Sequence, residues 1–177
     1  ALADFNKSIE LNSESSLAYN NRGNIKSDLG DPTGAIEDYD EAINLDPTFA
    51  MPYNNRGTAK SKLGDKKSAI ADYNKAIEIN PSSAKAYSNR GNIKSELLKN
   101  YSGAIADYNK AIEINPKDEK SWCLRGRAKN RLDNYQDAID DLTKAIELDN
   151  DYARAWGIRG NVKTLLEDYQ GAIDDSS

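Results

Sequence analysis

The sequence predicts an all-α solenoid built from antiparallel helix pairs, and three observations support this prediction. An aromatic residue with Arg-Gly beginning three residues later recurs at steps of 34 residues, with a single step of 35. The aromatic residues are Tyr19, Tyr53, Tyr87, Trp122 and Trp156. Later in each repeat, apolar residues such as Ile70, Tyr73 and Ile77 fall on one face of a helix. Gly and Pro stand at fixed places between these segments. A constant period in this range is typical of a solenoid.

The repeats divide the chain into one elongated array over residues 1–177. We expect a half repeat at 1–15, full repeats at 16–49, 50–83, 84–118 and 119–152, and a truncated repeat at 153–177. The first helix of a repeat, for example 51–63, ends in Leu-Gly because Gly adopts the left-handed conformation that closes a helix. The second helix begins after a capping residue and ends before Pro or its replacement; the expected caps are Asp31, Asp65, Asn100, Asn134 and Asp168. The extra residue of the third full repeat falls in 98–100, between two helices.

This pattern resembles the tetratricopeptide repeat of bacterial-type proteins. In the second full repeat the residues that carry the resemblance are Tyr53, Gly57, Ala69, Tyr73, Ala76 and Pro81. The resemblance implies a right-handed superhelix in which the first helices line a concave groove that holds partner peptides. The sequence departs from the family at two places in every repeat. Arg22, Arg56, Arg90, Arg125 and Arg159 stand where the family usually has Leu, and Lys26, Lys60, Lys94, Lys129 and Lys163 where it usually has Tyr.

The repeated Arg is a poor core residue unless it is paired with an acid. Each repeat carries an Asp directly before the aromatic residue of its second helix or the residue that replaces it: Asp38, Asp72, Asp107, Asp141 and Asp175. We expect each Arg to meet such an Asp in its own or the adjacent repeat, and for Arg90 both Asp107 and Asp72 are candidates. We interpret these residues as structural ion pairs. The Lys row is interpreted as stems that cover apolar surface while the ammonium groups stay in water.

The composition argues against several classes of function. The chain has no His, and its lone Cys123 has no imidazole to activate it, so we expect no enzyme, no catalytic residue, no metal site and no cofactor. We interpret Cys123 as a surface or groove residue. The net charge of −5 disfavours nucleic acid or an anionic membrane as partner. No segment has the features of a membrane span or signal peptide; the compartment stays undetermined, with the cytoplasm favoured.

The resemblance also places residues on the groove side of the first helices. The polar candidates for peptide binding are Asn20, Asn21, Asn24, Asn54, Asn55, Lys85, Asn89, Asn92, Lys120, Arg127, Arg131 and Arg154. Within this set, Asn21, Asn55 and Asn89 form a row that resembles the asparagine ladder of some family members, in which amides hold a peptide backbone. The row ends at Leu124, where the candidates become basic. The dicarboxylate clamp of chaperone-binding members is matched by Asn24, Asn55 and Lys85, but Asn20 and Asn89 replace its two other cations.

Two functional hypotheses follow. The preferred one is a non-enzymatic protein-interaction scaffold that binds extended polar or acidic peptide segments, with a carboxylate near the basic end of the groove. The alternative is self-assembly, in which the apolar faces of the end repeats associate head to tail into oligomers. RNA binding is disfavoured by the acidic balance. The sequence names neither the partner nor the pathway.

Overall fold

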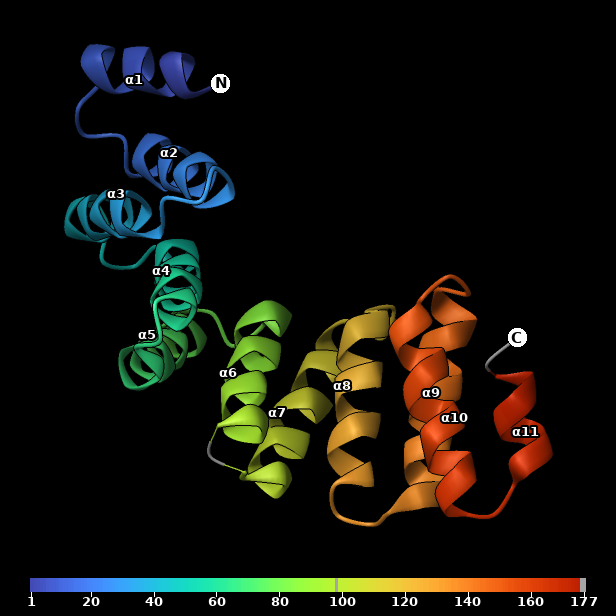
Figure 1. The fold of residues 1–177 in the computed structure, drawn as a ribbon. Coiled ribbons are helices and arrows are strands. Elements are labelled where there is room, and N and C mark those ends of the chain that lie inside the picture. Colours follow the sequence, from blue (N-terminus) through green and yellow to red (C-terminus); the bar gives the residue numbers. More distant parts are fainter. Residues whose placement is uncertain (98, 176–177) are drawn as a thin grey trace. The chain divides into compact units, whose positions relative to one another are not determined.

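The computed structural model describes residues 1–97 and 99–175, and within these residues the chain forms eleven α-helices and no strand. The half repeat contributes α1, and each later repeat contributes two helices (Figure 1). The first helices are α2 (Ser16–Asp28), α4 (Ala50–Lys62), α6 (Ala84–Glu96), α8 (Glu119–Asn130) and α10 (Ala153–Leu165). The second helices are α1 (Leu2–Leu11), α3 (Pro32–Leu45), α5 (Lys66–Ile79), α7 (Tyr101–Ile114), α9 (Tyr135–Leu148) and α11 (Tyr169–Asp174). Residue 98 of the expected inter-helix turn and residues 176–177 of the last repeat lie outside the described residues.

The chain divides into two compact units, residues 1–89 and the described part of 90–177, with the division inside α6. In the first unit, consecutive helices pack on one another from α1 to α5, and α2 also contacts α4. In the second unit, the same order runs from α7 to α11, and α8 also contacts α10. Each first helix in these pairs therefore lies against its own second helix and against the neighbouring repeat. This all-helical repeat architecture confirms the fold class that the sequence predicts.

Side chains and turns set the helix ends. Asp65 caps α5 by accepting a hydrogen bond from the backbone N–H of Ser68 (3.1 Å), and Asp31, Asn100 and Asp168 cap their helices in the same way. Asn134 precedes α9 but makes no such bond, so the prediction of a capping side chain is wrong there.

The turn after each first helix requires a left-handed residue. Gly30 and Gly64 adopt it with φ of 84° and 89°. In the later repeats Lys99, Asp133 and Glu167 occupy this conformation with φ of 51°, 59° and 62°. A Cβ atom is unfavourable in this region, so the three later turns carry strain that Gly would relieve.

Small residues allow the paired helices to approach. Ala69 and Ala76 of α5 are fully buried, and Tyr73 between them is 2% exposed. A Cβ added to Gly57 of α4 would lie 2.9 Å from Tyr73 Cε1 and 3.2 Å from the carbonyl oxygen of Ala69. Gly157 of α10 differs, because a Cβ there would have no atom within 4 Å. Only the first of these two glycines is therefore required by packing.

Cys123 is a core residue, and the interpretation as a surface or groove residue is wrong. Its side chain is fully buried in one cluster with Leu142 of α9 and with Ala155 and Val162 of α10. The first helix of the following repeat covers this position, an effect of stacking that the sequence of one repeat does not show. Burial raises the pKa of the Cys123 thiol, although Arg154, Tyr152 and Arg127 act in the opposite direction. Its neighbour Leu124, also assigned to the groove side, is buried too.

Within the described residues no helix is both long and apolar enough to cross a membrane.

Candidate functional site

The most regular polar feature is a triad of Arg, Lys and Asp that recurs in every full or truncated repeat. In the fourth full repeat, Arg125 Nε and Nη2 donate to the two carboxylate oxygens of Asp141 at 2.8 and 2.6 Å. Lys129 Nζ lies 3.0 Å from the same carboxylate, whose side chain is 4% exposed. Equivalent contacts join Arg22 and Lys26 to Asp38, Arg56 and Lys60 to Asp72, Arg90 and Lys94 to Asp107, and Arg159 and Lys163 to Asp175.

The triads specify what the sequence left open. Each Arg meets the Asp of its own repeat, so Arg90 pairs with Asp107. The interpretation of the Lys row is wrong on one point, because each ammonium group binds the buried Asp instead of remaining in water. Two cations therefore share one buried carboxylate in each triad.

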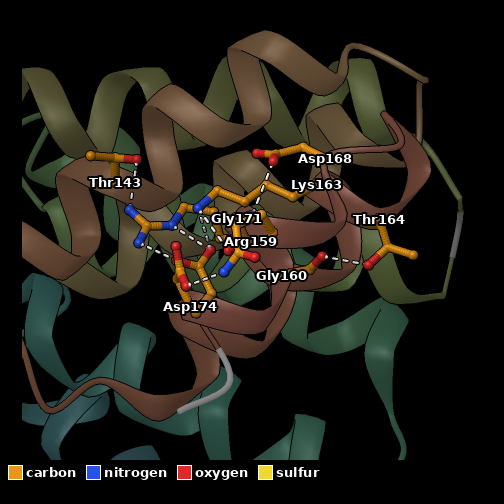
Figure 2. Close-up of polar contacts among 10 residues, drawn as sticks. Thr143, Arg159, Gly160, Lys163, Thr164, Asp168, Gly171 and Asp174 are labelled. Atoms are coloured by element: carbon orange, nitrogen blue, oxygen red, sulfur yellow. Dashed lines mark hydrogen bonds and ion pairs between the residues drawn. The ribbon is translucent and has the colours of Figure 1, made fainter.

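Most of these Arg side chains also reach the second helix of the preceding repeat. Arg125 Nη1 donates to Asn109 (2.7 Å), and Arg159 Nη1 donates to Thr143 (2.9 Å). Figure 2 shows Arg159 reaching toward Thr143 with Lys163 beside it. Arg56 contacts Asp40 in the same manner. Burial lowers the pKa of Arg56, but its bonds to Asp72 and Asp40 raise the pKa by more, so it lies above the ordinary value. The triads thus join consecutive repeats, which is a structural role.

Asparagines join consecutive first helices in the first unit. Asn55 Nδ2 donates to Asn20 (3.1 Å) and Asn24 (3.0 Å), which belong to the preceding repeat. Asn89 Nδ2 likewise donates to Asn54 (3.1 Å) and to the hydroxyl of Thr58 (3.4 Å). The Nδ2 atom of each of these two amides therefore has two acceptors within the chain.

These hydrogen bonds between first helices leave fewer free amide groups in the asparagine row for a peptide. Asn20 is 2% exposed, so its assignment as a groove residue is wrong: α4 packs over it. Its own Nδ2 donates to Asn21 (3.3 Å), and Asn54 Nδ2 donates to Asn55 (3.2 Å). Two other asparagines accept hydrogen bonds from buried tyrosines: the hydroxyl of Tyr39 donates to Asn24, and that of Tyr108 donates to Asn92. The row acts first as an inter-repeat hydrogen-bond network.

Two hollows lie at equivalent places, where the first helices of consecutive repeats end. The first, called here the Asp28–Lys62 hollow, has a volume of about 350 Å³ and is lined by Asn24, Ser27, Asp28, Tyr39, Asn55, Thr58 and Lys62. The second, the Glu96–Arg131 hollow, has a volume of about 130 Å³ and is lined by Ser95, Glu96, Lys99, Tyr101, Arg127 and Arg131. Both are polar, but only the second contains three cations.

The cations of the first helices differ from those of the second helices in their pairing. Along the second helices, exposed lysines pair locally with a Glu three residues on, as Lys75 does with Glu78 (2.7 Å) and Lys144 with Glu147 (2.9 Å). On the first-helix side of the second unit, the exposed Lys120, Arg131 and Arg154 make no ion pair within the described part of the chain. Arg127 is paired with Glu96 at 2.9 Å. Lys85, in the first unit, is exposed.

The groove residues expected from the sequence leave out three residues of the Glu96–Arg131 hollow: Glu96, Lys99 and Tyr101. Glu96 could have been found by aligning the repeats, because it occupies the place of Asp28. Tyr101 is the first residue of α7, at the place of Tyr135 in the next repeat, and Lys99 lies in the turn before it; the sequence assigns neither place to the groove side. Among the described residues, no group of three His, Cys, Asp or Glu side chains is placed to hold a metal ion.

The chain is a helical-repeat scaffold: its helix pairs recur along the sequence, small residues lie where the paired helices cross, and triads link neighbouring repeats. Sequence models of the tetratricopeptide repeat match residues 16–49, 50–83 and 84–118, and a second model of the same repeat matches 107–140. Together these matches cover more than half of the chain, and the chain belongs to the tetratricopeptide repeat family. It is a scaffold of the protein-interaction class, a fold that is generally non-enzymatic.

Several solved structures share this fold. YrrB, described as a TPR protein with an unusual peptide-binding site, has a TM-score of 0.78 and 23% identity over 99% of this chain and 90% of its own. MamA from Desulfovibrio magneticus RS-1 has a TM-score of 0.80 and 21% identity over 90% of each chain. A chain of the Cut9–Hcn1 hetero-tetramer of the APC/C has a TM-score of 0.85 and 18% identity over 98% of this chain and 34% of its own length. No curated protein sequence matches.

Proposed function

We propose that the chain binds extended polar or acidic peptide segments on the side formed by its first helices, without catalysis or a cofactor. The observation that carries this proposal is the set of unpaired exposed cations Lys120, Arg131 and Arg154 in the second unit. In a protein of net charge −5, cations left without local partners on one helix set are available to an acidic ligand.

The polar lining of the first-helix side supports an extended ligand. Hydroxyl and amide groups of Ser27, Thr58 and Asn55 line the Asp28–Lys62 hollow. Such groups can both donate and accept, which suits the backbone of a peptide of varied sequence. YrrB, described as having a peptide-binding site, provides an example of this fold in that role.

The test compares a charge-reversed variant with a matched control. Peptides are selected from a random display library on the wild type, and their affinities are measured by fluorescence anisotropy. The variant Lys120→Glu/Arg131→Glu/Arg154→Glu should weaken the acidic peptides by about tenfold or more at low salt, because each reversal replaces attraction by repulsion. Arg127 is left intact because it already pairs with Glu96.

The control reverses three lysines of the second helices, Lys7→Glu/Lys75→Glu/Lys144→Glu, which changes the net charge by the same amount. This control should retain the affinity within about twofold, since those lysines lie away from the first-helix side. Equal losses in both variants would reduce the effect to overall charge and contradict the proposal. Selection of peptides with no acidic preference would also contradict it.

A second candidate function is self-association through the terminal helices. No residue of α1 is buried, and Leu11 is 77% exposed. In α11, Tyr169 and Ile173 are 61% and 60% exposed. Apolar side chains exposed at both terminal helices favour contact with another copy. Light scattering over a concentration series tests this: a mass above 19.6 kDa that falls in Tyr169→Ser/Ile173→Ser supports it, and a monomer throughout refutes it.

A further inference from the structure

We infer that the Glu96–Arg131 hollow is a subsite for one carboxylate of the bound peptide, and that Glu96 occupies it in the free protein. This inference rests on the proposed function and names the chemical group that the site would take. It goes further in assigning Glu96 as an internal competitor, so that removing an acid from this surface should strengthen binding of another acid.

The charges of the hollow favour an anion. Lys99, Arg127 and Arg131 line it together with one acid, Glu96. Neither Lys99 nor Arg131 makes a side-chain hydrogen bond or ion pair within the described residues. The C-terminal ends of α6 and α8 are also near and each contribute roughly half a negative charge, while the N-terminal end of α7, at Tyr101, contributes roughly half a positive charge. After Glu96 and these helix ends are counted, the three cations still leave a positive excess, which suits a single carboxylate.

Arg127 is more buried than its acidic partner. The Arg127 side chain is 20% exposed. Glu96 is 56% exposed and contacts Arg127 through one Nη2–Oε1 pair of 2.9 Å. A single exposed ion pair contributes little to stability, so an incoming carboxylate can displace Glu96 at small cost. The guanidinium can then bind it through two parallel N–H groups.

The hollow of the first unit provides an internal comparison. The Asp28–Lys62 hollow has an acid at the place of Glu96 and a cation at the place of Arg131. The neutral Thr58 replaces Arg127 there, and Lys62 Nζ donates to Ser27 Oγ at 3.2 Å. One acid and one cation cancel, so this hollow has no positive excess and should not bind a carboxylate.

The experiment titrates the ¹⁵N-labelled protein with small carboxylates and follows the side-chain N–H signals of Arg127 and Arg131 by NMR. N-acetylglutamate α-amide presents only a side-chain carboxylate, N-acetylglycine presents only a terminal one, and N-acetylglutamine amide presents neither. The Glu96→Gln variant should bind the preferred carboxylate about two- to fivefold more tightly, the factor expected when an exposed competing pair is removed. Asp28→Asn, the matched substitution in the other hollow, should leave the affinity unchanged, and Arg131→Gln should weaken it.

Unchanged affinity in Glu96→Gln, or equal shifts for the uncharged amide, would overturn the inference. Equal tightening in Asp28→Asn would do so as well, since it would reduce the effect to net charge. The two proposals fail separately. If selected peptides bind and Arg131→Gln does not weaken them, the subsite is refuted while the scaffold function stands. If the small carboxylates bind as expected but no peptide is selected, the subsite stands and the peptide-binding function fails.

Discussion

Removing the shared carboxylate of one triad gives the sharpest test of the structural account. Asp141 is 4% exposed and accepts from Arg125 at 2.8 and 2.6 Å, with Lys129 at 3.0 Å. The side chains of the two cations are 15% and 18% exposed. Asp141→Ala therefore leaves two largely buried cations beside each other without their counter-charge. Breaking a buried pair in this way costs roughly 3–5 kcal/mol of unfolding free energy.

Removing all three charges should cost much less than removing one. In Arg125→Leu/Lys129→Leu/Asp141→Leu no charge is left uncompensated, and such replacements are often neutral or stabilising by about 1–4 kcal/mol. The triple variant also loses the contact of Arg125 over the Trp122 ring (4.7 Å), worth about 0.5–1 kcal/mol. We expect its stability to lie within about 1 kcal/mol of the wild type.

The assay combines urea unfolding followed by circular dichroism with amide hydrogen exchange of α8 and α9. Exchange is needed because a repeat array can open locally before it unfolds as a whole. Lys144→Ala, which breaks the exposed pair with Glu147, is the control and should change stability by less than about 0.5 kcal/mol. The reasoning is refuted if Asp141→Ala costs no more than this control, or if the triple variant costs as much as Asp141→Ala.

Three further predictions concern packing, backbone strain and pH. Gly57→Ala should destabilise by about 1–3 kcal/mol through overpacking, whereas Gly157→Ala, in open space, should stabilise by about 0.5–1 kcal/mol; urea melts of both compare them directly. Glu167→Gly should raise the melting temperature, gaining about 1 kcal/mol by relieving a left-handed φ of 62°, and a lower melting temperature would contradict this. Burial raises the pKa of Asp175, but the bonds and charges of Arg159 and Lys163 lower it by more, so the pKa lies below its ordinary value of 3.8. Its stabilising contribution is therefore present above that value and lost as pH falls through the folded pKa, and a ¹³C carboxyl titration should show a higher midpoint in Arg159→Gln.

The repeat period and the residue types at fixed places predict the fold class and the family. Aromatic, Gly and Ala residues at fixed steps specify two helices and their crossing, because helix periodicity and close approach are local requirements. The left-handed turn after each first helix was visible only where Gly occupies it, at Gly30 and Gly64. At Lys99, Asp133 and Glu167 the same conformation is imposed by the neighbouring helices in spite of the residue type.

The sequence places the Arg, Lys and Asp rows in register, since all three recur with the repeat. It does not show which carboxylate each cation reaches, and from the sequence alone the Lys ammonium groups are expected to stay in water. The structure shows that the place of Lys on the first helix brings its ammonium group to the same Asp as the Arg. A distance between two helices depends on how they cross, and this is a tertiary property.

The sequence by itself determined the helix pairs, their order and the family, because each depends on spacing within about one repeat. Only the tertiary structure decided which polar groups remain available to a partner. It buried Cys123 and Asn20 under the next first helix and used the amides of Asn55 and Asn89 within the chain. It left Lys120, Arg131 and Arg154 without local acids. Availability is set by the stacking of neighbouring repeats, and no single repeat contains that information.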